Sequence, residues 1–168
     1  MTSIDGSRGH ERLIIFLSGS RSVGRLDAAY AGRLDNILTR DFEIVIGDAG
    51  GADLAMQHHL AQRLAHRVTV FSALDEPRHN VGNWPVRRII SSAPVGSRAR
   101  HMAKDRAMAQ MADYGMMLWD GRSAGTLANI VELSRRQRPS IVYAQPRTAF
   151  LTIRAEADLD RLRAWARG

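Results

Sequence analysis

Three glycine-rich polar turns each follow a run of strand-type apolar residues and open a helix-like segment. They are Ser18-Gly19-Ser20-Arg21, Gly47-Asp48-Ala49-Gly50-Gly51-Ala52-Asp53 and Asp120-Gly121-Arg122-Ser123-Ala124-Gly125-Thr126. Glycine lets the backbone come close to a ligand, and a helix amino-terminus offers free N–H groups and partial positive charge to an anion. Three such turns in one chain indicate a site for a phosphorylated or nucleotide-like ligand.

The first and third turns carry the groups that we expect to hold phosphate. These groups are hydroxyls, backbone N–H groups and one guanidinium, from Ser18, Gly19, Ser20, Arg21, Gly121, Ser123, Gly125 and Thr126. The third turn is the strongest signal, because Thr126 can both cap the helix and bond a phosphate oxygen. The chain has no Gly-Lys-Ser/Thr string and no Gly-x-Gly-x-x-Gly after its first strand. This disfavours P-loop nucleoside-triphosphate hydrolysis and a standard NAD enzyme.

The second turn adds carboxylates. The Gly50-Gly51 pair, which follows Gly47, permits positive φ and a close approach. Asp53 suits a helix cap or a first-turn carboxylate. Asp48 is open between a structural role and a bond to a ribose hydroxyl, a bond that Asp120 in the third turn could also make.

Lys104 is the only lysine in a chain with 23 arginines. Its compact ammonium differs from the planar guanidinium, so a specific role at a phosphate is one interpretation and a solvent-facing side chain is the other. The segment Arg98–Ala112 has a helical pattern and leads into a strand. We therefore expect Lys104 near the strand ends, with its ammonium on the phosphate.

The elements that position these residues alternate between strands and helices. Strand patterns cover Leu13–Leu17, Glu43–Ile46, Arg67–Phe71, Tyr114–Trp119 and Ser140–Tyr143, and helical patterns cover Leu26–Leu38, Ala52–Ala65, Arg98–Ala112 and Gly125–Arg136. Alternation of this kind predicts parallel βαβ units with right-handed crossovers. We expect an α/β fold: a Rossmann-like three-layer sandwich of about five parallel strands ordered 3-2-1-4-5, with helices on both faces. Phe150–Ile153 and Glu156–Ala166 would form a small strand–helix appendage.

The domain organisation follows from length and composition. At 168 residues with 45% hydrophobic side chains, the chain suits one domain, which we assign to residues 12–168. Residues 1–11 are polar and are expected to be a disordered lead-in without a secretory signal. The segment Ser72–Ser97 lacks periodicity and contains Asn83 and Trp84. An aromatic residue beside Asn and Arg suits a nucleotide base, so we interpret the segment as a lid or flap, with a surface excursion or partner contact as the alternative.

Composition narrows the function classes. The chain has no cysteine, which fits a reducing compartment, and no apolar run long enough to span a membrane, so we expect a cytoplasmic protein. The net charge is +7, but the basic residues are dispersed, which disfavours specific nucleic-acid binding. No spacing predicts a metal site or a bound cofactor. The Met-rich helix around Met108 and Met111 is a candidate homodimer surface.

Together these motifs resemble the SLOG superfamily, which joins the DNA-processing SMF proteins with the Lonely-guy phosphoribohydrolases. The matching strings are Gly19-Ser20-Arg21, Gly47-Asp48-Ala49-x-Gly51-Ala52-Asp53, Asn80-x-Gly82-Asn83-Trp84, Lys104-Asp105, Ala112-Asp113 and Trp119-Asp120-Gly121-x-Ser123-x-Gly125-Thr126. They look most like small stand-alone bacterial members of unknown function and cover residues 13–166. The resemblance implies a Rossmann-like fold with a nucleotide or nucleotide-derived ligand over the strand ends.

The resemblance does not imply a reaction. In Lonely-guy enzymes a catalytic glutamate stands three residues after the Gly-Thr pair, where this chain has Asn129, and an arginine precedes the lysine, where it has Ala103. Asparagine cannot supply a carboxylate to an oxocarbenium-like centre. Both departures weaken the case for an enzyme and leave the case for binding intact.

Three functions remain as hypotheses. The leading one is binding or sensing of a nucleotide or nucleotide-derived small molecule at the strand ends. The alternative is an N-glycosidic hydrolase or transferase acting on a nucleotide, with Asp48, Asp105, Asp120 or Glu132 as the carboxylate. The third is a nucleic-acid-binding accessory protein, which would show steep salt dependence.

Overall fold

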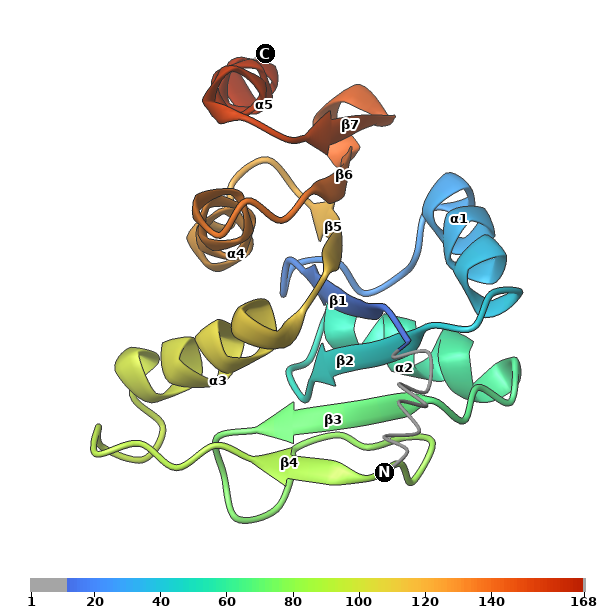
Figure 1. Cartoon of the computed structure of the whole chain (residues 1–168), viewed down its shortest axis with the longest axis vertical. Helices are drawn as coiled ribbons and strands as arrows, with labels where there is room; N and C mark the ends of the chain where they lie inside the picture. Colours follow the sequence, from blue (N-terminus) through green and yellow to red (C-terminus); the bar gives the residue numbers. More distant parts are fainter. Residues whose placement is uncertain (1–11, 168) are drawn as a thin grey trace, which may run out of the picture.

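The computed structural model describes residues 12–167 as one sheet of seven strands with five α-helices and a short 3-10 helix (Figure 1). The predicted lead-in, residues 1–11, lies outside the described part of the chain. The strands are β1 (Ile14–Gly19), β2 (Glu43–Gly47), β3 (Val68–Ser72), β4 (Val86–Arg88), β5 (Tyr114–Trp119), β6 (Ser140–Ala144) and β7 (Ala149–Ile153). The helices are α1 (Ala28–Leu38), α2 (Ala52–Gln62), α3 (Arg98–Met111), α4 (Ala124–Arg135), η1 (Gln145–Arg147) and α5 (Glu156–Arg167).

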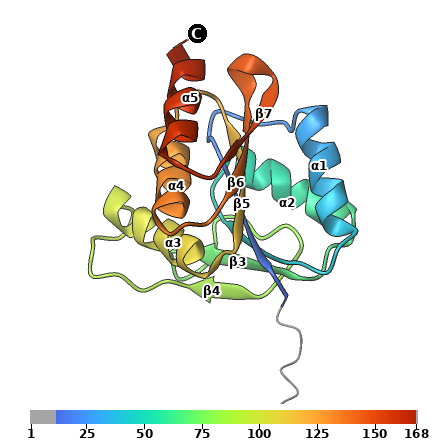
Figure 2. The same cartoon turned by 45° about the horizontal axis from the view of Figure 1, so that its top comes forward.

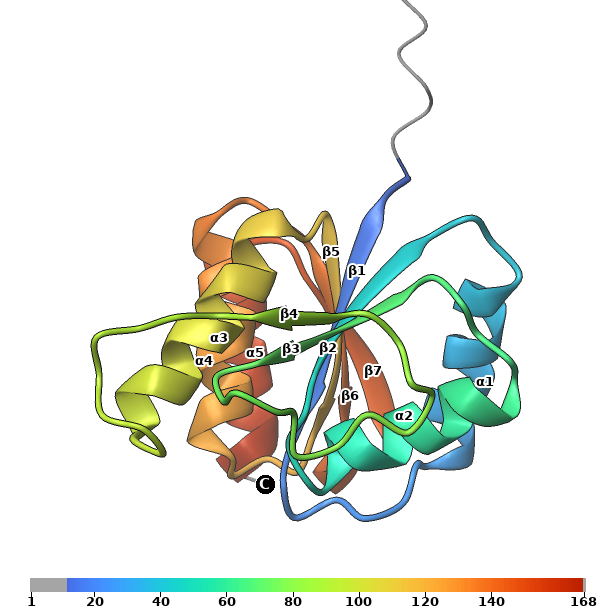
Figure 3. The same cartoon turned by 90° about the horizontal axis from the view of Figure 1, so that it is seen from below.

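The sheet lies between two layers of helices (Figures 2 and 3). One core packs α1 and α2 against one face of the sheet, and the other packs α3, α4 and α5 against the opposite face. Side chains of β1 alternate between the two cores, with Ile15 and Leu17 in the first and Phe16 in the second. Burial on both faces explains why the central strands are continuous apolar runs. The predicted three-layer α/β fold is confirmed.

The strand order is β4-β3-β2-β1-β5-β6-β7. Its five central strands are the five that the sequence predicted, in the predicted order, and all are parallel. The number of strands is seven rather than five, because one strand is added at each edge. The appendage contributes β7, which pairs antiparallel with β6, and the Ser72–Ser97 segment contributes β4, which pairs parallel with β3.

The chain changes direction across the sheet between β1 and β5. From β1 it continues to β2 on one side, and from β5 it continues to β6 on the other. In open α/β sheets, ligands bind in the crevice outside the carboxyl ends of the strands at this switch point. The first glycine-rich turn follows β1 and the third follows β5, so both open at that point.

No helix within residues 12–167 is both long enough and apolar enough to cross a membrane.

Candidate functional site

The first and third turns touch each other at the switch point. Ser20 Oγ lies 3.4 Å from Thr126 Oγ1 and accepts a hydrogen bond of 3.1 Å from the backbone N–H of Asp120. Ser20 and Thr126 are 0% and 2% exposed, so their hydroxyls lie beneath the surface. The two turns come together as the sequence predicted. Their buried hydroxyls join the turns, however, and do not reach the surface.

Asp120 shapes the third turn. Its Oδ1 accepts hydrogen bonds from the backbone N–H groups of Arg122 and Ser123, at 2.8 and 2.7 Å, and its Oδ2 accepts one from Ser22 Oγ at 2.6 Å. Burial opposes ionisation of Asp120, but these hydrogen bonds outweigh it and hold its pKa below the ordinary value. The carboxylate therefore holds the turn in shape, and its bond to a ribose hydroxyl stays a prediction.

The amino-terminus of α4 is open to solvent. Ser123 caps it, since its Oγ accepts a hydrogen bond of 3.3 Å from the N–H of Thr126. Gly125 is exposed, and a Cβ placed there would meet no atom within 4 Å. The side chains of Arg21 and Arg122 are exposed on the neighbouring turns. This end of α4 thus has free N–H groups, and an exposed arginine stands on each adjoining turn, a combination that suits an anion.

Two glycines hold these turns in shape. Gly121 has φ of 82°, and a Cβ there would lie 2.7 Å from Pro146 Cγ. Gly51 has φ of 69°, and its Cβ would overlap the backbone of Arg21. The second turn therefore packs directly against the first, which is reinforced by a 3.2 Å hydrogen bond from the N–H of Ala52 to the carbonyl of Ser20.

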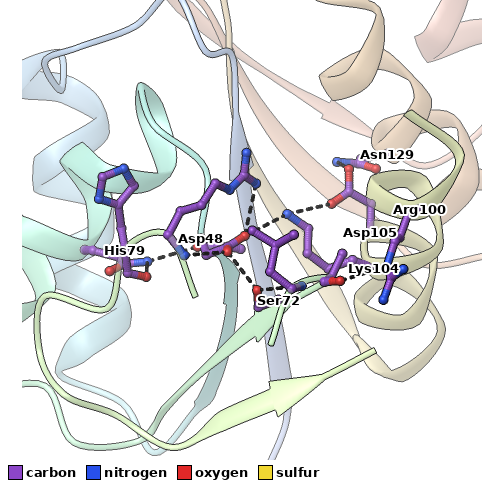
Figure 4. A network of polar contacts seen from close by, with 12 residues as sticks. Asp48, Ser72, His79, Arg100, Lys104, Asp105 and Asn129 are labelled. Atoms are coloured by element: carbon purple, nitrogen blue, oxygen red, sulfur yellow. Dashed lines mark hydrogen bonds and ion pairs between the residues drawn. The ribbon is translucent and has the colours of Figure 1, made fainter. Parts of the chain in front are cut away.

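A buried polar network lies beneath the second turn, at the carboxyl ends of β2 and β3 (Figure 4). Asp48 is its centre and is 0% exposed. It accepts hydrogen bonds from Ser72 Oγ (2.8 Å), the Arg78 N–H (2.9 Å), Arg78 Nη2 (3.1 Å) and Lys104 Nζ (3.3 Å). Burial alone would raise the pKa of Asp48, but these donors lower it far below the ordinary value. Asp48 is fully used within the fold, which corrects its predicted role at a ribose hydroxyl.

Lys104 lies at the strand ends, where the sequence placed it, but it is only 3% exposed. Its Nζ is 3.3 Å from Asp48 Oδ1 and 3.9 Å from Asp105 Oδ1. Gly47 lies against the same ammonium, because a Cβ there would be 3.2 Å from Lys104 Nζ and 2.6 Å from Asp53 Oδ2. The ammonium is thus enclosed by three aspartates and does not reach the surface, so the direct phosphate contact that we expected is corrected to an internal role.

Asp53 and Asp105 are the two carboxyl groups of this network with raised pKa values. Asp53 lies in the first turn of α2, whose N-cap is Gly51, and burial raises its pKa to about 7 against the opposing charge of Lys104. Burial also raises the pKa of Asp105, against Lys104 and a hydrogen bond from Asn129. The Asp105 side chain keeps 29% of its surface exposed, so it is the carboxyl group of the network that solvent reaches.

Asn129 links this network to the first turn. Its Nδ2 donates to Ser18 Oγ at 3.0 Å and to Asp105 Oδ2 at 3.4 Å. Asn129 on α4 therefore contacts a carboxyl group on α3. The sequence could not reveal this pairing, because α3 and α4 come together only in the fold.

Three residues that the sequence proposed for the site lie away from the glycine-rich turns. Trp84 is 7% exposed, packs in the core with α2 and donates from Nε1 to the carbonyl of Ala65 at 2.7 Å, so it cannot stack on a base. Its exposed neighbour Asn83 precedes β4 and therefore lies toward the amino ends of the parallel strands, away from the glycine-rich turns. Glu132 pairs with Arg136 at 2.9 Å in the second half of α4, away from the turns.

The two methionines of α3 that the sequence singled out pack toward the core, whereas Met102 on the same helix is exposed. Met108 is 1% exposed, and Met111 packs against the same core. This side of the helix is used within the fold, and a homodimer surface on α3 stays a prediction.

Sequence reasoning missed Ser72, Arg78 and His101. Ser72 ends β3, and Arg78 lies in the loop that follows, where no periodicity predicts a position.

A shallow hollow of about 210 Å³ lies at the amino ends of the parallel strands, beside the starts of β2 and β3, and takes no part in this site. Within residues 12–167, no three His, Asp or Glu side chains form a group that could hold a metal ion.

Comparison with known proteins gives no relative: no protein-family model, curated protein or solved structure matches the chain.

Proposed function

We propose that the protein binds or senses a nucleotide or nucleotide-derived small molecule at the carboxyl ends of its parallel strands. The observation that carries this proposal is the junction of the first and third turns at the switch point, fixed by Ser20 and Thr126 at 3.4 Å. The junction holds the exposed amino-terminus of α4 beside the exposed Arg21. The SLOG resemblance of the motifs agrees with this proposal.

The phosphate of the ligand would lie against the N–H groups at the start of α4. Partial positive charge from the helix and a bidentate hydrogen bond from Arg21 would favour it there. The buried hydroxyls of Ser20 and Thr126 act one layer below, because they fix the spacing of the turns. This arrangement differs from a P-loop, in which a lysine reaches the phosphate, since Lys104 is occupied by Asp48.

A thermal-shift screen tests the proposal. The panel contains nucleoside monophosphates, cyclic dinucleotides and ADP-ribose derivatives, and a true ligand at 100 times its Kd adds about 2.7 kcal/mol to the unfolding free energy. Mass spectrometry of any small molecule released by heat from the purified protein supplies an independent identification. A panel without any shift, together with an empty heat extract, would overturn the proposal.

One observation favours a second candidate, an N-glycosidic hydrolase or transferase acting on a nucleotide. Of the four carboxyl groups proposed from the sequence, Asp48 accepts four hydrogen bonds, Asp120 holds its own turn and has a lowered pKa, and Glu132 pairs with Arg136. Asp105 alone combines partial exposure with a pKa raised by burial, the property of a general acid.

Incubation with nucleoside monophosphates, followed by chromatography for free base, tests this candidate. Asp105→Asn keeps the shape of the side chain and removes the carboxyl group. Base release that Asp105→Asn abolishes, with nucleotide binding retained, would establish the enzyme. Absence of release from every monophosphate that binds would leave binding as the function.

A further inference from the structure

Two buried nitrogen atoms near the Asp48 network have no hydrogen-bond partner. They are Nε of Arg78 and Nδ1 of His101. The other buried side-chain atom without a partner in the described part of the chain is Ser140 Oγ. It lies at the start of β6, at the amino ends of the parallel strands and away from this region. Buried polar groups are nearly always hydrogen-bonded. The Nε–H of Arg78 can only donate, and His101 becomes a second donor without an acceptor in the tautomer that carries its proton on Nδ1.

Arg78 and His101 approach the network from different elements. The backbone N–H and Nη2 of Arg78 hold Asp48, which fixes the guanidinium and leaves Nε unused. His101 lies one turn before Lys104 on α3, and Lys104 contacts the same carboxylate. The charges that face His101 come from Arg78, Lys104, Arg21 and Asp48; burial first, and then the three cations, lower its pKa.

The charge balance here favours an anion. Asp48 is the one carboxylate of the network whose pKa is lowered, while those of Asp53 and Asp105 are raised. Arg100 is 9% exposed and donates to the carbonyls of Ala73 and Ala93, which carry no formal charge. Around α3, four cationic side chains (Arg21, Arg78, Arg100 and Lys104) therefore accompany the three carboxyl groups of Asp48, Asp53 and Asp105.

We propose that Arg78 and His101 form a subsite for a second anionic group of the ligand, a phosphate or a carboxylate. One oxygen would accept hydrogen bonds from Arg78 Nε and from the Nδ1–H form of His101. Arg21 links the two subsites, because it follows β1 beside the third turn and its charge also acts on His101 and Asp105. The inference rests on the proposed function for the rest of the ligand, and it adds that this ligand carries two anionic groups.

Sulfate tests the subsite directly, without any nucleotide. The His101 ring is followed by NMR over a pH titration, in sodium sulfate and in sodium chloride at equal ionic strength. Sulfate is expected to raise the midpoint of the His101 titration, because a bound dianion stabilises the imidazolium. Equal midpoints in the two salts would overturn the inference.

Matched nucleotides then test the two-anion ligand. The probes are adenosine 5′-monophosphate, adenosine 5′-diphosphate and adenosine 3′,5′-bisphosphate, measured by calorimetry with wild type and His101→Phe. We expect a two-phosphate probe to bind wild type at least about tenfold more tightly than the monophosphate, and His101→Phe to remove that advantage while leaving the monophosphate within about twofold.

The outcomes separate the two proposals. If nucleotides bind, but a second phosphate adds no affinity that depends on His101 and sulfate does not shift the His101 titration, the inference fails and the proposed function stands. If sulfate shifts His101 but no nucleotide binds, the anion subsite stands and the proposed function fails.

Discussion

The ammonium of Lys104 lies 3.3 Å from Oδ1 of Asp48, and these residues are 3% and 0% exposed. This ion pair joins α3 to the end of β2 directly beneath the second glycine-rich turn. Taking two charges out of water is costly, and the cost is offset here by hydrogen bonds to Asp48 from Ser72 and Arg78. The pair positions the turns rather than contacting a ligand.

Removing the ammonium should therefore destabilise the fold. Lys104→Met keeps the length and the apolar stem of the side chain. We expect it to lower the unfolding free energy by about 3 kcal/mol, the lower end of the range for a broken buried ion pair, because Arg78 still neutralises Asp48. Urea denaturation measures the change.

Arg163→Met is the matched control. Arg163 forms an exposed i,i+3 pair with Asp160, so its loss should change the unfolding free energy by less than about 0.5 kcal/mol. Equal effects of the two substitutions would show that the Lys104–Asp48 pair is not important for stability.

Asp53 should make stability depend on pH. Burial raises the pKa of Asp53 from 3.8 to about 7. Between these two pH values, the folded state therefore keeps a proton that the unfolded state has already released. The stability that this proton gives is fully present below pH 3.8 and is lost as the pH rises through about 7. A pKa change of this size corresponds to a loss of at most about 4 kcal/mol.

Asp53→Asn isolates this effect, because the amide mimics the protonated carboxyl group. The unfolding free energy of wild type, compared with that of the variant, should fall between about pH 4 and pH 7. Other groups cancel in the comparison, including Asp48, whose lowered pKa acts in the opposite direction. Parallel curves for the two proteins would contradict the raised pKa.

Neighbouring glycines in the second turn should respond differently to alanine. Gly51 has φ of 69°, and a Cβ there would overlap the backbone of Arg21, whereas a Cβ at Gly50 would meet no atom within 4 Å. We expect Gly51→Ala to cost at least about 2 kcal/mol, from backbone strain and displacement of the first turn. Gly50→Ala should stay within about 0.5 kcal/mol. Thermal denaturation distinguishes them, and a harmless Gly51→Ala would refute the contact between the turns.

Trp84 should matter for stability and not for the ligand. Its Nε1 donates to the carbonyl of Ala65 at 2.7 Å, and its ring packs in the core. Trp84→Phe should lower the unfolding free energy by about 1–3 kcal/mol, because it leaves a carbonyl without its donor. Calorimetry should find the affinity for any nucleotide identified in the screen unchanged. A large loss of affinity in a stable variant would return Trp84 to the site.

The central sheet was predictable because each of its strands is an apolar run covered on both faces. The edge strand β4 was not predictable, since its sequence Val86-Arg87-Arg88 is exposed and shows no alternation of apolar and polar residues. The βαβ rhythm predicted parallel strands, and the expected strand order, which the structure has, brings the first and third turns together.

The roles of individual polar residues were less accessible. Ser20, Asp48 and Lys104 were expected at a ligand, but each is buried on partners that only the fold supplies. For Asp48 these partners are Ser72 and Arg78, 24 and 30 residues away along the chain. Glycine spacing locates the turns, whereas it carries no information on which side chains fill the space beneath them.

The most direct test of anion binding at the switch point is a single charge at the start of α4. A side chain at the exposed Gly125 meets open space, so Gly125→Gln and Gly125→Glu should both fold, and they differ in charge alone. Calorimetry with the nucleotide identified in the screen compares them at low ionic strength. We expect Gly125→Glu to weaken binding at least about tenfold more than Gly125→Gln, because its carboxylate repels the phosphate at the helix amino-terminus. Equal affinity of the two variants would contradict a phosphate site at this end of α4.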